Sequence, residues 1–196
     1  MQRRLEQRLK QALSQRQKSR VVDASRVSAA VLIHIYYKQG EYYTLFTKRT
    51  ETVQDHKGQI SFPGGAYEKK DETLANTALR ECSEEIGLAS EAVELLGELD
   101  DFATTTSGYI ISPFVAAIPW PYRFKADPIE VESIIEVPIA ALLAKDCLRP
   151  ETRITNGRAA TSYDYHYQGT IIWGATARIL SHFLDIWAQV IKDREG

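Results

Sequence analysis

Apolar residues recur at every second position in one early segment of the chain, which is the period of a strand with one buried face. These residues are Val27, Ala29, Val31, Ile33 and Ile35. A turn at Gln39-Gly40-Glu41 follows, and a second apolar run extends from Tyr43 to Thr47. The pattern therefore predicts that the chain folds back on itself as two adjacent strands.

Similar patterns predict further strands and two more helices. Strands are expected at residues 93–99, 109–118, 129–137 and 163–172. A short helix is expected at 138–144, beginning at a proline, and a long closing helix at 173–192. The apolar side of the closing helix carries Ala177, Leu180, Leu184 and Trp187. Strands mixed with helices over 196 residues predict a single α/β domain, although the spacing alone allows several α/β layouts.

One further helix carries an unusual concentration of acid. Residues 80–88 read Arg-Glu-Cys-Ser-Glu-Glu-Ile-Gly-Leu. Because a helix turns about 100° per residue, Glu81, Glu84 and Glu85 fall within an arc of roughly 100°. The opposite, apolar side carries Ala75, Leu79, Cys82 and Ile86. Like charges at these spacings destabilise a helix, so the pattern favours neutralisation by a cation, and oxygen ligands suit Mg²⁺ or Mn²⁺.

A glycine-rich segment precedes this acidic helix. Residues 58–65 read Gly-Gln-Ile-Ser-Phe-Pro-Gly-Gly, which predicts a short strand that ends in a glycine loop. Asp71 is a candidate N-cap for the helix, and Gly87 is its candidate stop. The unit is therefore expected to run strand, glycine loop, acidic helix.

This unit resembles the Nudix box. The matching residues are Gly65, Arg80, Glu81, Glu84, Glu85, Gly87 and Leu88, with Cys82 as a small hydrophobe in an aliphatic position. The loop is one residue longer than the general box, so either Asp71 or Glu72 takes the first acidic position. The resemblance implies a Nudix-type α/β/α sandwich and a divalent-metal-dependent hydrolase of phosphoanhydrides.

The segment just upstream resembles the coenzyme A diphosphatase branch of that family. The matching residues are Leu45, Thr47, Arg49, Gly58, Phe62, Pro63, Gly64 and Gly65, and the wider likeness extends over residues 26–185. Two positions depart from the branch pattern, because Thr50 replaces Ser or Ala and Gln54 replaces Arg. A neutral Gln binds phosphate less strongly than a charged, bidentate Arg, so the coenzyme A assignment is weaker than the family assignment.

The resemblance assigns roles to individual residues. The metal ligands are expected to be Glu81, Glu84 and Glu85, and the carboxylate that takes a proton from water is Glu81, Glu84 or a loop residue such as Glu130. Arg80 is expected to orient these carboxylates by hydrogen bonding. The residues expected to bind substrate are Arg49, Gln54, Gly64, Gly65 and Ser107.

Two of these substrate assignments have an alternative that the sequence leaves open. Arg49 is about equally suited to a structural salt bridge. The hydroxyl-rich loop from Thr104 to Tyr109, which contains Ser107, is suited to a ribose or a phosphate, but it also fits a plain hairpin turn. The four histidines receive no catalytic role.

Composition describes an ordinary globular protein. The net charge is -2 and the hydrophobic content is 44%, which indicates no general attraction to nucleic acid or membranes. No apolar run is long enough to predict an integral membrane segment. Two cysteines, Cys82 and Cys147, form no metal-binding spacing or disulfide framework, so a cytoplasmic location is expected.

The first residues differ from the rest of the chain. Seven basic residues and one acidic residue occur among the first twenty, with Leu5, Leu9, Ala12 and Leu13 at helical spacing. Such a segment fits a transit peptide or a membrane-surface helix, but a basic helix packed on the domain is favoured. The expected division is a basic N-terminal helix at 1–22 and a Nudix hydrolase domain at 23–196.

The favoured function is hydrolysis of coenzyme A or a derivative to 4'-phosphopantetheine and adenosine 3',5'-bisphosphate, with Mg²⁺ or Mn²⁺. The first alternative is hydrolysis of another nucleoside diphosphate linked to a second group, such as ADP-ribose. The second is a Nudix-fold module that binds a ligand without catalysis. The expected partner is a coenzyme A-like small molecule, and a homodimer is suggested only by analogy with the fold.

Overall fold

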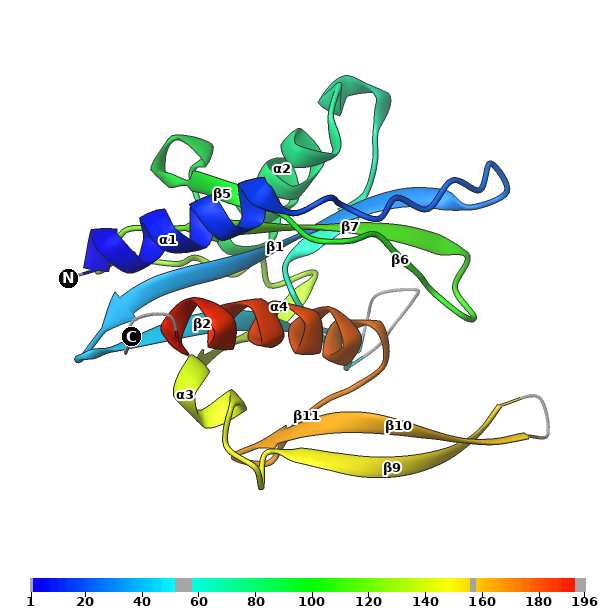
Figure 1. Cartoon of the computed structure of the whole chain (residues 1–196). Coiled ribbons are helices and arrows are strands. Elements are labelled where there is room, and N and C mark those ends of the chain that lie inside the picture. The colour runs from blue at the N-terminus through cyan, green and yellow to red at the C-terminus, as the bar shows by residue number, and fades with distance from the viewer. Residues whose placement is uncertain (1, 52–57, 156–157, 193–196) are drawn as a thin grey trace.

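The computed structural model describes residues 2–51, 58–155 and 158–192, and Figure 1 shows their arrangement. Within this part of the chain, eight strands form the main sheet. They are β1 (Val27–Lys38), β2 (Glu41–Arg49), β3 (Ile60–Ser61), β4 (Gly64–Ala66), β5 (Glu94–Glu98), β6 (Phe102–Ala103), β7 (Tyr109–Ala117) and β8 (Val131–Pro138). The long strands β1 and β7 are parallel and the other pairings are antiparallel, so the sheet is mixed.

Helices cover both faces of this sheet. Helix α2 (Leu74–Ile86) packs against the face that carries Ala30, Leu32 and Tyr36 of β1. Helices α1 (Gln2–Gln15) and α4 (Gly174–Lys192) lie on the opposite face, against Ile33 and Ile35. This division follows from the alternation along β1, which sends successive apolar side chains to opposite layers. The predicted α/β/α sandwich is confirmed.

The last third of the chain adds a second, smaller sheet. A short helix, α3 (Ile139–Leu142), leads to β9 (Leu148–Thr155), β10 (Arg158–Tyr167) and β11 (Thr170–Ile172). The prediction of one strand over 163–172 was wrong, because the chain turns at Gln168 and Gly169, whose φ angles are 46° and 83°. Strand β9 was not predicted, because charged residues such as Arg149 and Glu151 interrupt any apolar alternation there.

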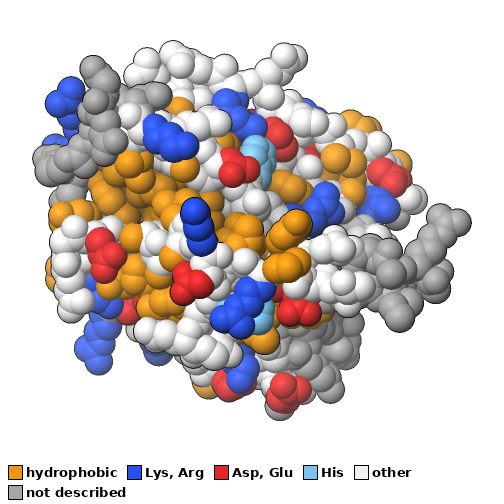
Figure 2. All heavy atoms as spheres, turned by 60° about the horizontal axis from the view of Figure 1, so that its bottom comes forward, with side chains coloured by type: hydrophobic (Ala, Val, Ile, Leu, Met, Phe, Trp, Pro, Cys, Tyr) orange, Lys and Arg blue, Asp and Glu red, His pale blue; other side chains and the backbone are white. Residues whose placement is uncertain are grey.

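Several large hydrophobic side chains remain exposed around α3 and this smaller sheet. They are Leu143, Leu148, Tyr163, Ile171 and Trp173. Figure 2 views the molecule from this side and shows hydrophobic side chains gathered between scattered charged ones.

The N-terminal helix α1 packs on the rest of the domain. Leu9 and Leu13 are buried in the core beside α4, and a side chain at Gly97 of β5 would collide with Leu13, since an added Cβ would lie 2.7 Å from the Leu13 Cβ. One basic residue of this helix pairs with an acid of the domain: the Lys10 ammonium lies 2.9 Å from a Glu94 carboxylate oxygen. None of the described helices is both long and apolar enough to cross a membrane.

Candidate active site

The acidic helix α2 begins and ends at identifiable caps. Thr73, and not the predicted Asp71, is its N-cap, since the Thr73 side chain accepts a hydrogen bond from the Asn76 N–H. At the other end Gly87 adopts the left-handed conformation with φ 66°, and its N–H donates to the Ser83 carbonyl, as predicted for the stop. These two caps define where the acidic helix begins and ends.

Asp71 instead forms the central ion pair of the site with Arg80. It ends a short 3₁₀ turn (Lys69–Asp71) and is buried. The Arg80 Nε lies 2.7 Å from one Asp71 oxygen and an Arg80 terminal nitrogen lies 3.1 Å from the other, while the Thr77 hydroxyl donates at 2.9 Å. The hydrogen bonds from Arg80 hold the pKa of the Asp71 carboxyl well below its usual range. Of the two candidate acids, Asp71 is therefore the one that pairs with Arg80, whereas Glu72 is exposed.

Arg80 also reaches the rest of the acidic cluster. One terminal nitrogen lies 2.8 Å from a Glu81 oxygen and 2.8 Å from a Glu84 oxygen. The other donates to the Ala66 carbonyl of β4 at 3.1 Å. This single guanidinium links helix α2 to the glycine strand and contacts two of the predicted metal ligands, Glu81 and Glu84.

Glu81 depends on the absence of a side chain at Gly65. A Cβ added at Gly65 would lie 2.5 Å from the carboxyl carbon of Glu81, so the carboxylate occupies the space that a larger residue would fill. Burial raises the pKa of the Glu81 carboxyl, although Arg80 beside it acts in the opposite direction. Gly65 therefore brings a partly desolvated carboxylate against the backbone of β4.

Gly64 is required for a different reason. It pairs with Val31 across the β1–β4 ladder, and an added Cβ would collide with the backbone carbonyl of Ala30. The predicted glycine loop is thus partly a strand, β4, whose backbone approaches β1 too closely for a side chain. The two neighbouring glycines therefore leave room for different groups. Gly64 leaves room for the backbone of β1, and Gly65 leaves room for the Glu81 carboxylate.

Glu85 is the most deeply buried acid of the cluster, with only 3% of its surface exposed. The Gly64 N–H donates to it at 3.4 Å, and an Arg49 terminal nitrogen lies 3.5 Å from its other oxygen. Both contacts are long. Burial raises the pKa of the Glu85 carboxyl to about 8, and the lowering effect of Arg49 does not compensate for it.

Arg49 and Glu130 border the same carboxylates. Arg49 ends β2, and its Nε is buried with no hydrogen-bond acceptor among the described residues. Glu130 lies in a turn before β8, not within the predicted strand, and its carbonyl accepts from the Thr50 N–H at 3.0 Å. The Glu130 charge is the smallest of the causes that raise the pKa values of Glu81 and Glu85, so this acid lies in the neighbourhood of both carboxylates.

The cluster has the donor chemistry for a hard divalent cation, but its members are not gathered around one point. Among the described residues, no three His, Cys, Asp or Glu side chains lie together so that they could hold a metal ion. The Glu84 side chain is 56% exposed and is paired with Arg80, so it does not lie at one point with Glu81 and Glu85. Two partly desolvated carboxylates with weak or shared partners nevertheless fit Mg²⁺ or Mn²⁺.

The other predicted site residues have different outcomes. Ser107 lies in the hairpin turn between β6 and β7, where its hydroxyl donates to Thr104 at 2.9 Å, so the described contacts are those of a turn. Gln54 and His56 lie outside the described residues. His34 is fully buried beside Cys82 in the core, 3.4 Å from its sulfur. The ion pair between Asp71 and Arg80 was not predicted. Counting six residues from Gly65 did give Asp71 as one of the two candidates for the first acidic position.

Comparison with known proteins identifies the family. The family model described as the NUDIX domain matches residues 25–154, which include β4, α2 and the turn that carries Glu130. This match covers more than half of the chain. The chain therefore belongs to the Nudix family and is a Nudix hydrolase.

Individual relatives agree with this assignment. A protein of Photorhabdus laumondii subsp. laumondii, named Nudix hydrolase NudL and described as uncharacterized, is 36% identical over 152 residues, 78% of this chain and 80% of that protein. A MutT/nudix family protein of Enterococcus faecalis has a similar fold, with a TM-score of 0.56 and 14% identity over 88% of this chain and 66% of that chain. The NUDIX domain of Shewanella oneidensis NrtR, solved with ADP ribose, gives a TM-score of 0.50 at 18% identity over 62% and 78% of the two chains.

Proposed function

We propose that this Nudix hydrolase cleaves the diphosphate of coenzyme A or a derivative, giving 4'-phosphopantetheine and adenosine 3',5'-bisphosphate. The observation that carries the proposal is the contact of Glu81 and Glu85 with the two glycines of β4. Both carboxylates lie directly against the backbone of Gly65 and Gly64. The sequence around these glycines is the part of the chain that resembles the coenzyme A branch.

The chain's own residues divide the work of the reaction. A bound divalent ion supplies Lewis acidity toward phosphoryl oxygens and lowers the pKa of a water molecule that it binds. Glu81, Glu84 and Glu85 would hold that ion, and Arg80 would position Glu81 and Glu84. Arg49, whose buried Nε has no acceptor among the described residues, donates to a diphosphate oxygen. The proton from water goes to Glu81, Glu84 or Glu130.

The test is a substrate panel with Mg²⁺ and with Mn²⁺. Coenzyme A, acetyl-coenzyme A, ADP-ribose and a dinucleotide polyphosphate are incubated with the purified chain, and mass spectrometry identifies the products. We expect 4'-phosphopantetheine and adenosine 3',5'-bisphosphate as the main pair. Negligible turnover of coenzyme A beside rapid turnover of ADP-ribose would reject this substrate and leave the second candidate.

The second candidate is another nucleoside diphosphate linked to a second group, such as ADP-ribose. It is favoured by Gln54, which stands where the coenzyme A branch has Arg and therefore offers no charge to an additional phosphate. The NrtR domain mentioned above was solved with ADP ribose, but its 18% identity supports the fold alone. The two candidates share the metal site and differ only in the groups beyond the diphosphate.

A further inference from the structure

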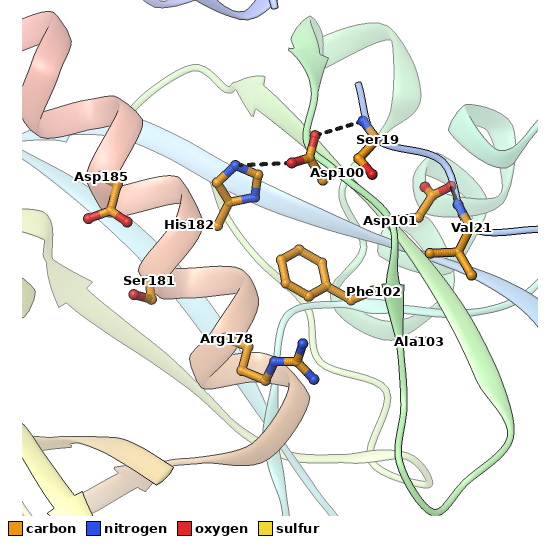
Figure 3. Close-up of a pocket in the computed structure, with 10 residues that line it drawn as sticks. All are labelled: Ser19, Val21, Asp100, Asp101, Phe102, Ala103, Arg178, Ser181, His182 and Asp185. Atoms are coloured by element: carbon orange, nitrogen blue, oxygen red, sulfur yellow. Dashed lines mark hydrogen bonds and ion pairs between the residues drawn. The ribbon is translucent and has the colours of Figure 1, made fainter. Parts of the chain in front are cut away.

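Two acidic regions outside helix α2 have different neighbours. The first is the groove around Phe102, which has a volume of about 640 Å³ and lies between helix α4, strand β6 and the segment that follows α1. In this groove Asp100 accepts a hydrogen bond from the Ser19 N–H at 3.0 Å, and the Lys18 ammonium lies 2.9 Å from Asp101. Figure 3 shows both aspartates beside this segment. They therefore hold the segment after α1 in place.

The second region is the turn at residues 127–130, the bridging turn, which leads into strand β8. At one end of it the Asp127 N–H donates to the Glu85 carbonyl of α2 at 2.9 Å. At the other end the Glu130 carbonyl accepts from the Thr50 N–H at 3.0 Å, just beyond strand β2. The bridging turn therefore joins the last turn of α2 to the end of β2, beside the acidic cluster.

Two side chains hold the bridging turn from opposite directions. The Thr50 hydroxyl donates to the Ile129 carbonyl at 2.7 Å, and the Asp127 carboxylate accepts from the Ile129 N–H at 2.7 Å. The Val131 N–H then donates to the Asp127 carbonyl at 2.8 Å and closes the turn. Both side-chain bonds are short, and the Ile129 carbonyl belongs to the peptide group that leads into Glu130.

Burial of apolar surface contributes little to the position of this turn. Ile129 is 72% exposed, although it is a large hydrophobic residue, and Pro128 and Glu130 are exposed as well. An exposed turn without a packed side chain opens easily unless hydrogen bonds hold it. The bonds from Thr50 and Asp127 are therefore the main constraint on its conformation.

The ladder between β2 and β8 is irregular at the same place. Its register shifts between Lys48 and Arg49, because Glu132 is an extra residue in β8. Such a bulge bends the strand and redirects the side chains beside it. Arg49 pairs with Val131, the residue directly after the bridging turn, and its terminal nitrogen lies 3.5 Å from Glu85. The bulge and the turn therefore shape the same edge of the acidic cluster.

Glu130 differs from the acids of α2 in what fixes its position. Arg80 lies 2.8 Å from Glu81 and 2.8 Å from Glu84, so an ion pair restrains each of these side chains. Glu130 forms no ion pair with any residue that the structure describes. Its position relative to the cluster therefore depends on the backbone of the bridging turn.

We propose that Thr50 and Asp127 are positioning residues of this hydrolase, which hold Glu130 at the edge of the acidic cluster through the bridging turn. This proposal rests on the proposed function in one respect, that a diphosphate is hydrolysed at the acidic cluster. Neither residue needs to touch the substrate. Misplacement of a reacting group by about 1 Å can cost on the order of a hundredfold in rate, so the two bonds to Ile129 affect the reaction through Glu130.

The first experiment compares variants that lose or keep each hydrogen bond, with saturating Mg²⁺ and the substrate that the panel identifies. Thr50→Val keeps the shape but not the hydroxyl, and should lower kcat about tenfold while KM changes less than about twofold. Thr50→Ser keeps the hydroxyl and should recover most of this loss. Asp127→Ala should lower kcat about tenfold, whereas Asp127→Asn keeps an acceptor for the Ile129 N–H and should stay within about threefold of the unchanged chain.

Thr152→Val is the matched control, since Thr152 is an exposed strand threonine of the smaller sheet. It should leave kcat and KM unchanged. Circular dichroism and melting temperature confirm that each variant is folded, and Thr50→Ala replaces Thr50→Val if the latter is not. An unchanged kcat in Thr50→Val would overturn the proposal. A loss in Asp127→Asn as large as in Asp127→Ala would overturn it too, because the charge and not the turn would then matter.

A double-mutant cycle tests whether Thr50 acts through Glu130. Glu130→Gln should lower kcat by at least about tenfold, and Thr50→Val added to Glu130→Gln should lower it by less than about twofold more. A further tenfold loss in the double variant would show that Thr50 acts elsewhere. An unchanged kcat in Glu130→Gln would also overturn the proposal, since no reacting group would depend on the turn.

Amide hydrogen exchange tests the bridging turn without substrate or metal. In EDTA, the Ile129 and Val131 N–H groups should exchange at least about tenfold faster in Thr50→Val and in Asp127→Ala than in the unchanged chain. Equal exchange rates would overturn the proposal, whatever the activity. If the panel shows no hydrolysis of any diphosphate, the proposed function fails, while exchange still decides whether Thr50 and Asp127 hold the turn.

Discussion

Asp71 and Glu85 are both buried carboxylates beside the same glycine strand, yet their environments shift their pKa values in opposite directions. Asp71 receives two hydrogen bonds from Arg80, one from Thr77 and one from the Glu68 N–H, so its charge is fully compensated. Glu85 has only two long contacts, and its pKa is raised to about 8. Compensated charge stabilises the fold, whereas uncompensated charge is available to a ligand. The difference separates the structural acid from the proposed metal ligand.

The largest effect should come from neutralising Glu85. In saturating Mg²⁺, Glu85→Gln should lower kcat on the preferred diphosphate by on the order of 10³-fold or more, because a metal ligand is lost. Initial rates on the substrate identified by the panel check this. Glu91→Gln is the control, since Glu91 is an exposed acid beyond the end of α2. Activity within tenfold of the unchanged chain would remove Glu85 from the metal site.

The next effect should come from Asp71, on stability. Asp71→Asn removes the buried carboxylate that pairs with Arg80 and leaves the guanidinium only Glu81 and Glu84, so the free energy of unfolding should fall by about 2–4 kcal/mol. Because the pKa of Asp71 is lowered in the folded state, its contribution is present above the unfolded pKa near 4 and disappears as the pH falls through the folded value. Urea unfolding at pH 7 and pH 3 measures both.

Glu72→Gln is the matched control for Asp71→Asn, because Glu72 is the neighbouring acid and is exposed. It should change stability by no more than about 0.5 kcal/mol. If Glu72→Gln destabilised the chain as much as Asp71→Asn, the choice of Asp71 for the first acidic position would be wrong.

Glu85→Gln should change stability in the opposite direction to Asp71→Asn: in the absence of metal, the variant should be more stable than the unchanged chain. Burial raises the pKa of the Glu85 carboxyl from its ordinary value of 4.5 to about 8, so the folded state keeps a proton that the unfolded state has lost. Stability of the unchanged chain in EDTA should therefore decrease as the pH rises from about 4.5 to about 8. At pH 8 the variant should therefore be more stable than the unchanged chain in EDTA, and the difference should shrink as the pH falls toward 4.5.

Bound metal should reverse the order of stability between the unchanged chain and Glu85→Gln. A ligand that binds only the folded state stabilises it, so Mg²⁺ or Mn²⁺ at pH 8 should raise the melting temperature of the unchanged chain more than that of Glu85→Gln. Melting curves in EDTA and in each metal provide the measurement. A variant that is less stable than the unchanged chain in EDTA at pH 8 would show that Glu85 is compensated after all.

The comparison also shows what the sequence could predict. The position of the acidic helix, its stop at Gly87 and the flanking strands follow from local periodicity and glycine chemistry, and the structure agrees. The roles of Asp71 and Glu85 do not follow from helical spacing, because one acid is paired with Arg80 nine residues away and the other is buried against β4. Helical spacing predicts that Glu81, Glu84 and Glu85 share one face of α2. Only tertiary packing determines that Glu85 is the one buried away from water.

The regions that were not predicted share a cause. Strand β9 is held by its pairing with β10 and not by an apolar pattern, so its own sequence carries no signal. The groove around Phe102 joins Val21, Asp101 and Arg178, which come from three distant parts of the chain. Each of these residues looks like an ordinary surface or strand position when its own segment is considered alone. Such sites depend on topology, which local patterns do not determine.

The smallest predicted effect distinguishes the two glycines of β4. In Gly65→Ala the new Cβ would lie 2.5 Å from the Glu81 carboxyl carbon, at the end of a side chain that can yield, so stability should change by no more than about 1 kcal/mol. The displaced carboxylate should lower kcat about tenfold, which corresponds to about 1.4 kcal/mol. Gly64→Ala is the comparison, because its Cβ would collide with the backbone of β1 and should cost stability first. The interpretation would be wrong if Gly65→Ala lost as much stability as Gly64→Ala and the folded fraction kept its kcat. Gly65 would then be needed for the packing of β4 and not for the position of Glu81.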